Sequence, residues 1–350
     1  MRRGYIDWLR GVSVLIMIEA HTLDAWTRLD ARHNSTYGWA MIVGGFAAPG
    51  FLFLAGLAIA MAAGSRLRRG LSDSEAATLA RRRALQIFGL AFLFRLQSWL
   101  ISGGDPVQAL LKVDILNIMG LSMLAAALLW SAGRARWDRA AWMLAATVAV
   151  AMITPVIRAT PLISPLPDPI EWYIRPIPGR GTFTLFPWSG FLLAGVAIGI
   201  WLDTARTPDA ERRVNVALAV IGLAAAAGGY AASYLPAIYH DSSFWTTSPT
   251  FFFVRLGILI LSLPVAYAWS ALWTGRSVLQ EFGQASLFVY WIHVELAYGV
   301  LSGPMHKSLT LGQAFTAYAI FSIALFGAAK LKNQIVDWWN TGRLQPSGAL

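Results

Sequence analysis

Five ionisable residues lie in one short stretch, residues 5–27, which is otherwise apolar enough to enter a membrane. They are Asp7, Arg10, Glu19, His21 and Asp24. A charged side chain at mid-bilayer costs about 2.5–3.5 kcal/mol on insertion scales, so such residues usually face a bundle interior and carry function. Because a helix turns about 100° per residue, Asp7, Arg10 and Asp24 lie on the same side as His21, and Glu19 lies opposite. The predicted helix therefore has one polar seam, which we interpret as the wall of an active site.

His21 is the residue of this seam best suited to proton transfer. Imidazole titrates near neutral pH and can take a proton from an attacking amine or hydroxyl. A carboxylate three residues later, Asp24, could hold the ring in the useful tautomer. The alternative is a histidine that only satisfies a helix–helix interface.

A second histidine lies in residues 282–298, FGQASLFVYWIHVELAY. Helical spacing puts Tyr290 and His293 on one face of this segment. They form either a second polar wall of the same cavity or an interhelical hydrogen bond. We predict that His21, Asp24 and His293 converge on one cavity. His33, just beyond the first apolar segment, is a competing catalytic histidine, although its position also suits an exposed loop.

Several arginines could bind an anionic donor. Arg10 could meet a phosphate or carboxylate with its planar fork, or form an internal ion pair with Asp7. The loop 65–83 has two arginine clusters, which include Arg66, Arg69 and Arg82. These could hold the phosphates of coenzyme A, or could set topology and contact anionic lipids.

The composition indicates a polytopic, all-α membrane protein. Of the 350 residues, 57% are hydrophobic and only 13% are charged, whereas soluble domains are usually near 25% charged. Apolar segments long enough to span a bilayer recur along the chain. We expect ten transmembrane helices, over residues 6–27, 37–62, 84–102, 113–132, 140–157, 184–202, 213–235, 250–273, 284–302 and 311–331.

The distribution of arginine predicts the topology. Basic residues gather in the loops that follow every second span, so the positive-inside rule places both termini in the cytoplasm. This rule also explains the net charge of +10, and nucleic-acid binding is not expected. We expect one membrane domain, residues 1–332, and a cytoplasmic tail, residues 333–350. Cysteine is absent, which excludes disulfides and thiol chemistry, and no metal site is expected. Arginine is far commoner than lysine and alanine is abundant, which suggests a bacterial inner membrane.

A series of segments resembles a known family. The opening stretch RRGYIDWLRGVSVLIMIEAHTLDAW, residues 44–56, 112–124 and 186–199, and FGQASLFVYWIHVEL are similar, in matching order, to the catalytic-domain family of heparan-α-glucosaminide N-acetyltransferase. That family belongs to a broader transmembrane acyltransferase superfamily. The resemblance implies a helical bundle that takes an acetyl group from cytoplasmic acetyl-CoA and passes it to a sugar acceptor on the far side. It also implies a catalytic histidine near the first helix, either His21 or His33. We prefer His21 because it lies in the polar seam.

These observations predict an acyl-CoA-dependent O- or N-acyltransferase that acts on a glycan or amino sugar. His21 would be the general base, oriented by Asp24, with His293 and Tyr290 across the cavity and Arg10 near the donor. Its partners would be acyl-CoA, the acceptor and membrane lipids, and the sequence leaves room for a homodimer. The alternative is a proton-coupled transporter that uses the same seam as its relay, although no inverted repeat is visible.

Overall fold

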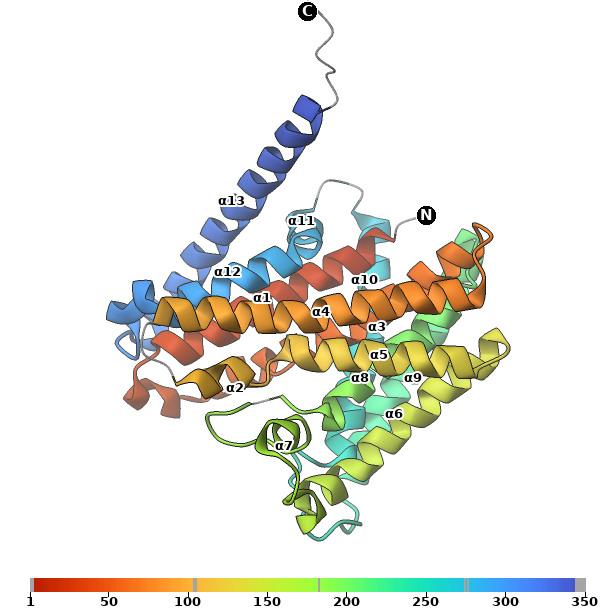
Figure 1. The fold of residues 1–350 in the computed structure, drawn as a ribbon, viewed down its shortest axis with the longest axis horizontal. Coiled ribbons are helices and arrows are strands. Elements are labelled where there is room, and N and C mark those ends of the chain that lie inside the picture. Colours follow the sequence, from red (N-terminus) through yellow and green to blue (C-terminus); the bar gives the residue numbers. More distant parts are fainter. Residues whose placement is uncertain (1–2, 103–105, 182, 274, 276, 344–350) are drawn as a thin grey trace, which may run out of the picture. The chain divides into compact units, whose positions relative to one another are not determined.

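The computed structural model describes residues 3–102, 106–181, 183–273, 275 and 277–343. This part of the chain contains thirteen α-helices and no β-strand longer than an isolated bridge, so the all-α prediction is confirmed (Figure 1). The fold divides into two compact units, which we describe separately. Unit 1 combines residues 1–47 with residues 275–350, and unit 2 is the continuous segment 48–274.

Unit 1 is organised around its first helix. Its elements are α1 (Gly4–Trp26), the 3₁₀ turn η1 (Leu29–His33), α2 (Ser35–Gly44), α11 (Val278–Gln284), α12 (Ser286–Tyr298), η4 (Val300–Met305) and α13 (Leu311–Arg343). Helix α1 packs on α2, α11, α12 and α13. The N-terminal helix therefore contacts four helices of unit 1, three of which come from the other end of the chain.

Two glycines allow α11 to cross α1 closely. A Cβ atom on Gly11 would lie 1.9 Å from the carbonyl oxygen of Leu279, and one on Gly283 would lie 1.9 Å from that of Asp7. No side chain larger than hydrogen fits at this distance, so both glycines are needed for the crossing. At the other end of α1, the backbone N–H of Arg28 donates to the carbonyl of Leu309 at 2.9 Å. These contacts fix both ends of α1 against the C-terminal segment.

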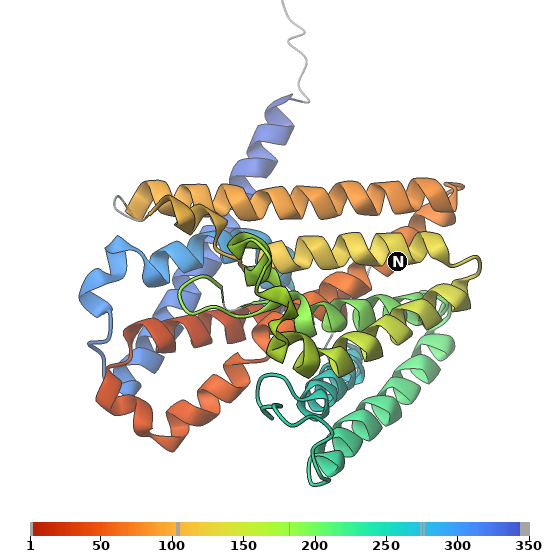
Figure 2. The same ribbon diagram turned by 60° about the horizontal axis from the view of Figure 1, so that its bottom comes forward.

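Unit 2 packs its helices through small residues. Its elements are α3 (Ala47–Leu67), α4 (Asp73–Ser102), η2 (Val107–Leu111), α5 (Ile115–Ala132), α6 (Arg136–Ala159), η3 (Pro161–Ile163), α7 (Asp168–Ile174), α8 (Leu185–Leu202), α9 (Pro208–Ala232) and α10 (Pro249–Leu272). Helix α4 lies beside α5 (Figures 1 and 2), and α9 packs on α10. Gly56 and Gly195 bring α3 and α8 together, since a Cβ on either would lie 2.0 Å from a carbonyl of the other helix. The glycines of α8 therefore serve close packing, as residues of this size do in membrane bundles.

Ion pairs gather at one end of the helices of unit 2. The buried carboxylate of Asp203, after α8, accepts from Arg68 and Arg206, both at 2.6 Å. Arg139, at the start of α6, pairs with Asp73, at the start of α4, at 2.9 Å. Arg68 follows the expected second span and Asp203 follows the sixth, so these two loops meet. Asp73 also follows the second span and Arg139 follows the fourth, so these two loops meet as well. The alternating topology requires these loops to lie on one side of the membrane, and the pairings agree with that; the assignment of this side to the cytoplasm stays a prediction.

Eight helical segments of the described chain are long and apolar enough to cross a membrane. They are Ser35–Leu67, Asp73–Ile101, Ile115–Ala132, Arg136–Ala159, Leu185–Leu202, Pro208–Ala232, Pro249–Leu272 and Leu311–Trp339. The two remaining expected spans differ for physical reasons. Residues 6–27 do form one helix, α1, but its charged residues make it too polar to be counted among these eight segments. Residues 284–302 are divided among α12, η4 and the end of α11, and α12 has only 13 residues, about 20 Å of helix.

The last helix is longer than expected. The sequence predicts that the final span ends near residue 331, whereas α13 continues to Arg343. The predicted tail, residues 333–350, is therefore helical over its first part, and residues 344–350 lie outside the described chain. Its cytoplasmic location stays a prediction.

Candidate active site

Two histidines from distant parts of the sequence meet in unit 1. His21 Nδ1 on α1 lies 2.7 Å from His293 Nε2 on α12. The two rings are nearly parallel, with an interplanar angle of 5° and centroids 4.9 Å apart. His293 is completely buried. The structure therefore brings together two of the three residues that the sequence had predicted to converge, His21 and His293.

The surroundings of His293 determine where the protons of this pair lie. Its Nδ1 is 2.9 Å from the carbonyl oxygen of Val289 and 2.8 Å from that of Tyr290. A carbonyl can only accept, so Nδ1 carries the hydrogen, and Nε2 of the neutral ring must accept. His21 then donates from its Nδ1 to His293. By the same rule, His21 Nε2 carries a lone pair, which is the form that a general base requires.

Asp24 joins this cluster through a tyrosine. Its carboxylate accepts from the hydroxyl of Tyr298 at 2.9 Å and from Arg32 at 3.4 Å. The Tyr298 ring meets His21 edge-on, with centroids 5.6 Å apart. Arg32 also donates to the backbone carbonyls of Asp24 and Thr27. Asp24 thus positions Tyr298 and Arg32. The sequence had predicted that Asp24 orients the His21 ring, whereas in the structure His21 Nδ1 is hydrogen-bonded to His293.

Tyr298 and Arg32 are residues that sequence reasoning missed. Tyr298 follows His293 by five residues, which does not place it on the same helical face. Arg32 lies in η1, outside the helix that carries Asp24, and reaches back to it because the chain turns after Trp26. A weak signal existed for Arg32, since it is a basic residue shortly after a carboxylate near the end of a membrane helix. No comparable signal identified Tyr298.

The acidic and basic residues at the start of α1 form an ion pair. Arg10 Nη1 lies 2.9 Å from Asp7 Oδ1, and the Asp7 side chain is only 7% exposed. This pair lies at the level of α1 where Gly283 packs on the Asp7 backbone carbonyl. The Tyr290 ring packs edge-on against His293, with centroids 5.8 Å apart. The contact of Arg10 or Tyr290 with a donor stays a prediction.

His33 lies away from hydrogen-bonding side chains. It is exposed on η1, and none of the described residues forms a hydrogen bond or ion pair with it. His21, in contrast, has a hydrogen-bond partner that fixes its tautomer. The preference for His21 over His33 stays a prediction.

The arginines proposed for the donor belong to unit 2. Arg66 closes the last turn of α3, Arg69 follows it and donates to Ser65 at 3.0 Å, and Arg82 is exposed on α4. Arg66 and Arg69 flank Arg68, which pairs with Asp203. The role of Arg66, Arg69 and Arg82 toward coenzyme A stays a prediction. Among the described residues, no three His, Asp or Glu side chains are grouped as metal ligands would be.

A comparison with protein families identifies the chain. The family model described as "Heparan-alpha-glucosaminide N-acetyltransferase, catalytic" matches residues 2–235, about two thirds of the sequence. The chain belongs to the heparan-α-glucosaminide N-acetyltransferase catalytic family. No curated protein matches it. The family is one of membrane acetyltransferases, in agreement with the eight candidate spans.

The family match covers only one partner of the histidine pair. His21, Asp24 and Arg32 lie inside residues 2–235, whereas His293 and Tyr298 lie outside them. The contact of the C-terminal residues with His21 therefore rests on the structure and not on the family match.

Proposed function

We propose that the protein transfers an acetyl group from cytoplasmic acetyl-CoA to a sugar or amino-sugar acceptor on the other side of the membrane, with His21 as general base. The observation that carries this proposal is the pair of histidines, whose hydrogen bonds assign the lone pair to His21 Nε2. Family membership supports the acetyl group and its coenzyme A carrier.

The proposed reaction is a direct acyl transfer. The acceptor nitrogen or oxygen attacks the thioester carbonyl carbon, so that a C–N or C–O bond forms and the C–S bond of acetyl-CoA breaks. His21 Nε2 takes the acceptor proton during the attack and returns it to the leaving sulfur. Coenzyme A then leaves as the thiol, and His21 is neutral again.

His293 stabilises the charge that develops on His21. When His21 becomes an imidazolium, its bond to His293 Nε2 becomes charge-assisted, and the carbonyls of Val289 and Tyr290 support His293 from behind. Hydrogen bonds to charged groups are worth about 1.5–3 kcal/mol. His293 is thus a positioning residue, comparable to the third member of a catalytic triad. Arg10, Arg66, Arg69 and Arg82 are proposed to attract the phosphates of the donor.

Transfer across a sealed membrane tests the function. Purified protein is reconstituted into liposomes loaded with glucosamine, and acetyl-CoA labelled in the acetyl group is added outside. We expect labelled N-acetylated sugar inside, with no accumulation in liposomes carrying His21→Ala. The proposal is wrong if the reconstituted wild-type protein neither binds acetyl-CoA nor releases coenzyme A with any amino sugar or hydroxyl acceptor tested.

A further inference from the structure

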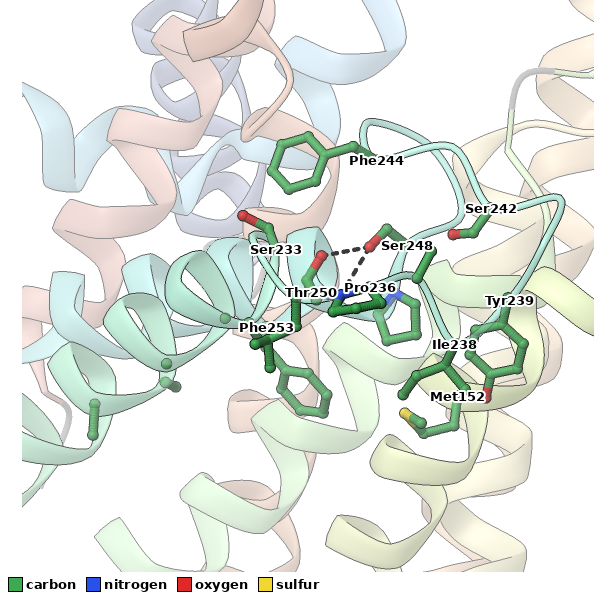
Figure 3. A pocket seen from close by; sticks show the side chains of 18 residues that line it. Met152, Ser233, Pro236, Ile238, Tyr239, Ser242, Phe244, Ser248, Thr250 and Phe253 are labelled. Carbon is green, nitrogen blue, oxygen red and sulfur yellow. Dashed lines mark hydrogen bonds between the residues drawn. The ribbon is translucent and has the colours of Figure 1, made fainter.

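Unit 2 contains a cavity that the proposed reaction does not use. Its volume is about 600 Å³, within the range of ligand-binding pockets. It lies between α9, the start of α10, the loop that joins them and Met152 of α6 (Figure 3). None of its 18 lining residues is charged. Figure 3 shows its polar edge, where the hydroxyls of Ser248 and Thr250 lie 2.5 Å apart.

Small residues of α9 create this hollow. Gly229 faces α10, where a Cβ would lie 2.8 Å from the carbonyl oxygen of Thr250. Its neighbour Gly228 lines the cavity, and a Cβ there would meet nothing within 4 Å. Gly229 is therefore explained by helix packing, whereas Gly228 borders open space.

The cavity lies at the end of two membrane helices. Both α9 and α10 are long and apolar enough to cross a bilayer. Tyr230, Tyr234 and Trp245, close to the cavity in sequence, are all exposed. Exposed tyrosine and tryptophan at the end of a membrane helix mark the level of the lipid headgroups. An uncharged hollow at this depth suits the aliphatic chain of a lipid.

One arginine beside the cavity lacks an acidic partner. Arg158 donates to the carbonyl of Thr246, between the lining residues Phe244 and Ser248, at 3.4 Å. Its other described bonds go to the Phe186 carbonyl and the Thr184 hydroxyl.

Within the described chain, Arg158 forms no ion pair. Arg255 forms none either, but it lies over the ring of Phe251, on the face of α10 away from the lining residues Thr250 and Phe253, so it is not part of the site. An uncompensated cation beside the cavity favours an anionic lipid headgroup.

We infer that unit 2 binds an anionic phospholipid, with one acyl chain in this cavity and its phosphate beside Arg158. The uncharged lining accepts the chain, and the Arg158 guanidinium balances the charge of the phosphate. This site is independent of acyl transfer, so it can be present even if the proposed reaction is wrong.

Photo-crosslinking in detergent tests the site on the full chain. Two probes carry the same diazirine acyl chain, one on phosphatidylglycerol and one on phosphatidylcholine. After irradiation, mass spectrometry maps the labelled peptides. We expect phosphatidylglycerol to label residues 224–253 above all others, and about fivefold more than phosphatidylcholine does, which is the effect of one basic residue near an anionic lipid.

Two variants give the controls. Gly228→Leu fills the hollow and should reduce labelling of residues 224–253 at least fivefold, whereas Gly89→Leu should not. Gly89 is also an exposed helical glycine of unit 2 that borders open space, so the pair is matched. Leucine favours helix over glycine, so both variants should fold. Arg158→Gln should lower phosphatidylglycerol labelling to the level of phosphatidylcholine, whereas Arg255→Gln, on the other face of α10, should not. Even labelling along the chain, unchanged labelling in Gly228→Leu, or equal labelling by the two probes would overturn the inference.

Discussion

Replacement of His293 should impair the chemical step while the donor still binds. In His293→Leu, the His21 Nδ1–H loses its acceptor at 2.7 Å, and the imidazolium that forms during transfer loses a charge-assisted bond. Such a bond is worth about 1.5–3 kcal/mol, and each 1.36 kcal/mol is a factor of ten in rate. We therefore expect kcat to fall about 10- to 150-fold. The KM for acetyl-CoA should change little, because His293 is completely buried and is not proposed to touch the donor.

His293→Gln is the matched conservative variant. Its amide oxygen can accept from His21 Nδ1 where the ring nitrogen did, so we expect it to recover kcat to within about tenfold of wild type. The assay is initial-rate release of coenzyme A with a saturating acceptor, on protein whose thermal unfolding midpoint is checked first. The reasoning is refuted if His293→Leu retains full kcat, or if leucine and glutamine lower it equally.

Further predictions address the other residues. Activity should fall as the pH is lowered, because protonation of both rings would place the N–H of His21 Nδ1 against the N–H of His293 Nε2 at 2.7 Å. A rate that rises as the pH falls would exclude His21 as the general base. His21→Ala should lose at least 100-fold in transfer rate, the lower end of what a general base contributes, whereas His33→Ala should stay near wild type; the reverse order would move the site to His33. Gly11→Ala should abolish folded protein in size-exclusion chromatography, since its Cβ would lie 1.9 Å from a carbonyl, whereas Gly312→Ala, which meets open space, should not; equal yields would contradict the close crossing. Asp203→Asn should lower the free energy of unfolding by about 1–3 kcal/mol, because two half-exposed arginines lose their shared carboxylate; an unchanged unfolding midpoint would show that the pair contributes nothing.

Helical periodicity was sufficient to predict the main elements and one contact between them. The apolar segments gave the all-α fold, and the polar face of residues 5–27 identified the helix on which unit 1 is organised. The contact of His21 with His293 could be predicted because each histidine lies on a polar helix face, and such faces turn away from lipid toward the interior of the bundle. The ion pair of Asp7 with Arg10 followed from their spacing of three residues.

Other features depended on backbone geometry that periodicity does not encode. The expected ninth span, residues 284–302, is cut short because α12 ends at Tyr298 and the chain continues from Gly299 into η4. Asp24 was expected to orient His21, but its carboxylate is engaged by Tyr298 and Arg32, which the chain brings back after leaving the helix. The cavity beside α9 was also missed, because alanine and glycine suggest close packing unless the neighbouring surface is known.

The most direct test of the central claim is acetyl-CoA turnover by purified His21→Gln and His21→Ala beside wild type. Both variants lack a basic nitrogen, and glutamine retains a side-chain amide that can still donate to His293. All three proteins should bind acetyl-CoA with similar affinity, and only wild type should release coenzyme A when an acceptor is present. Release at the wild-type rate by either variant would contradict the assignment of His21 as the general base.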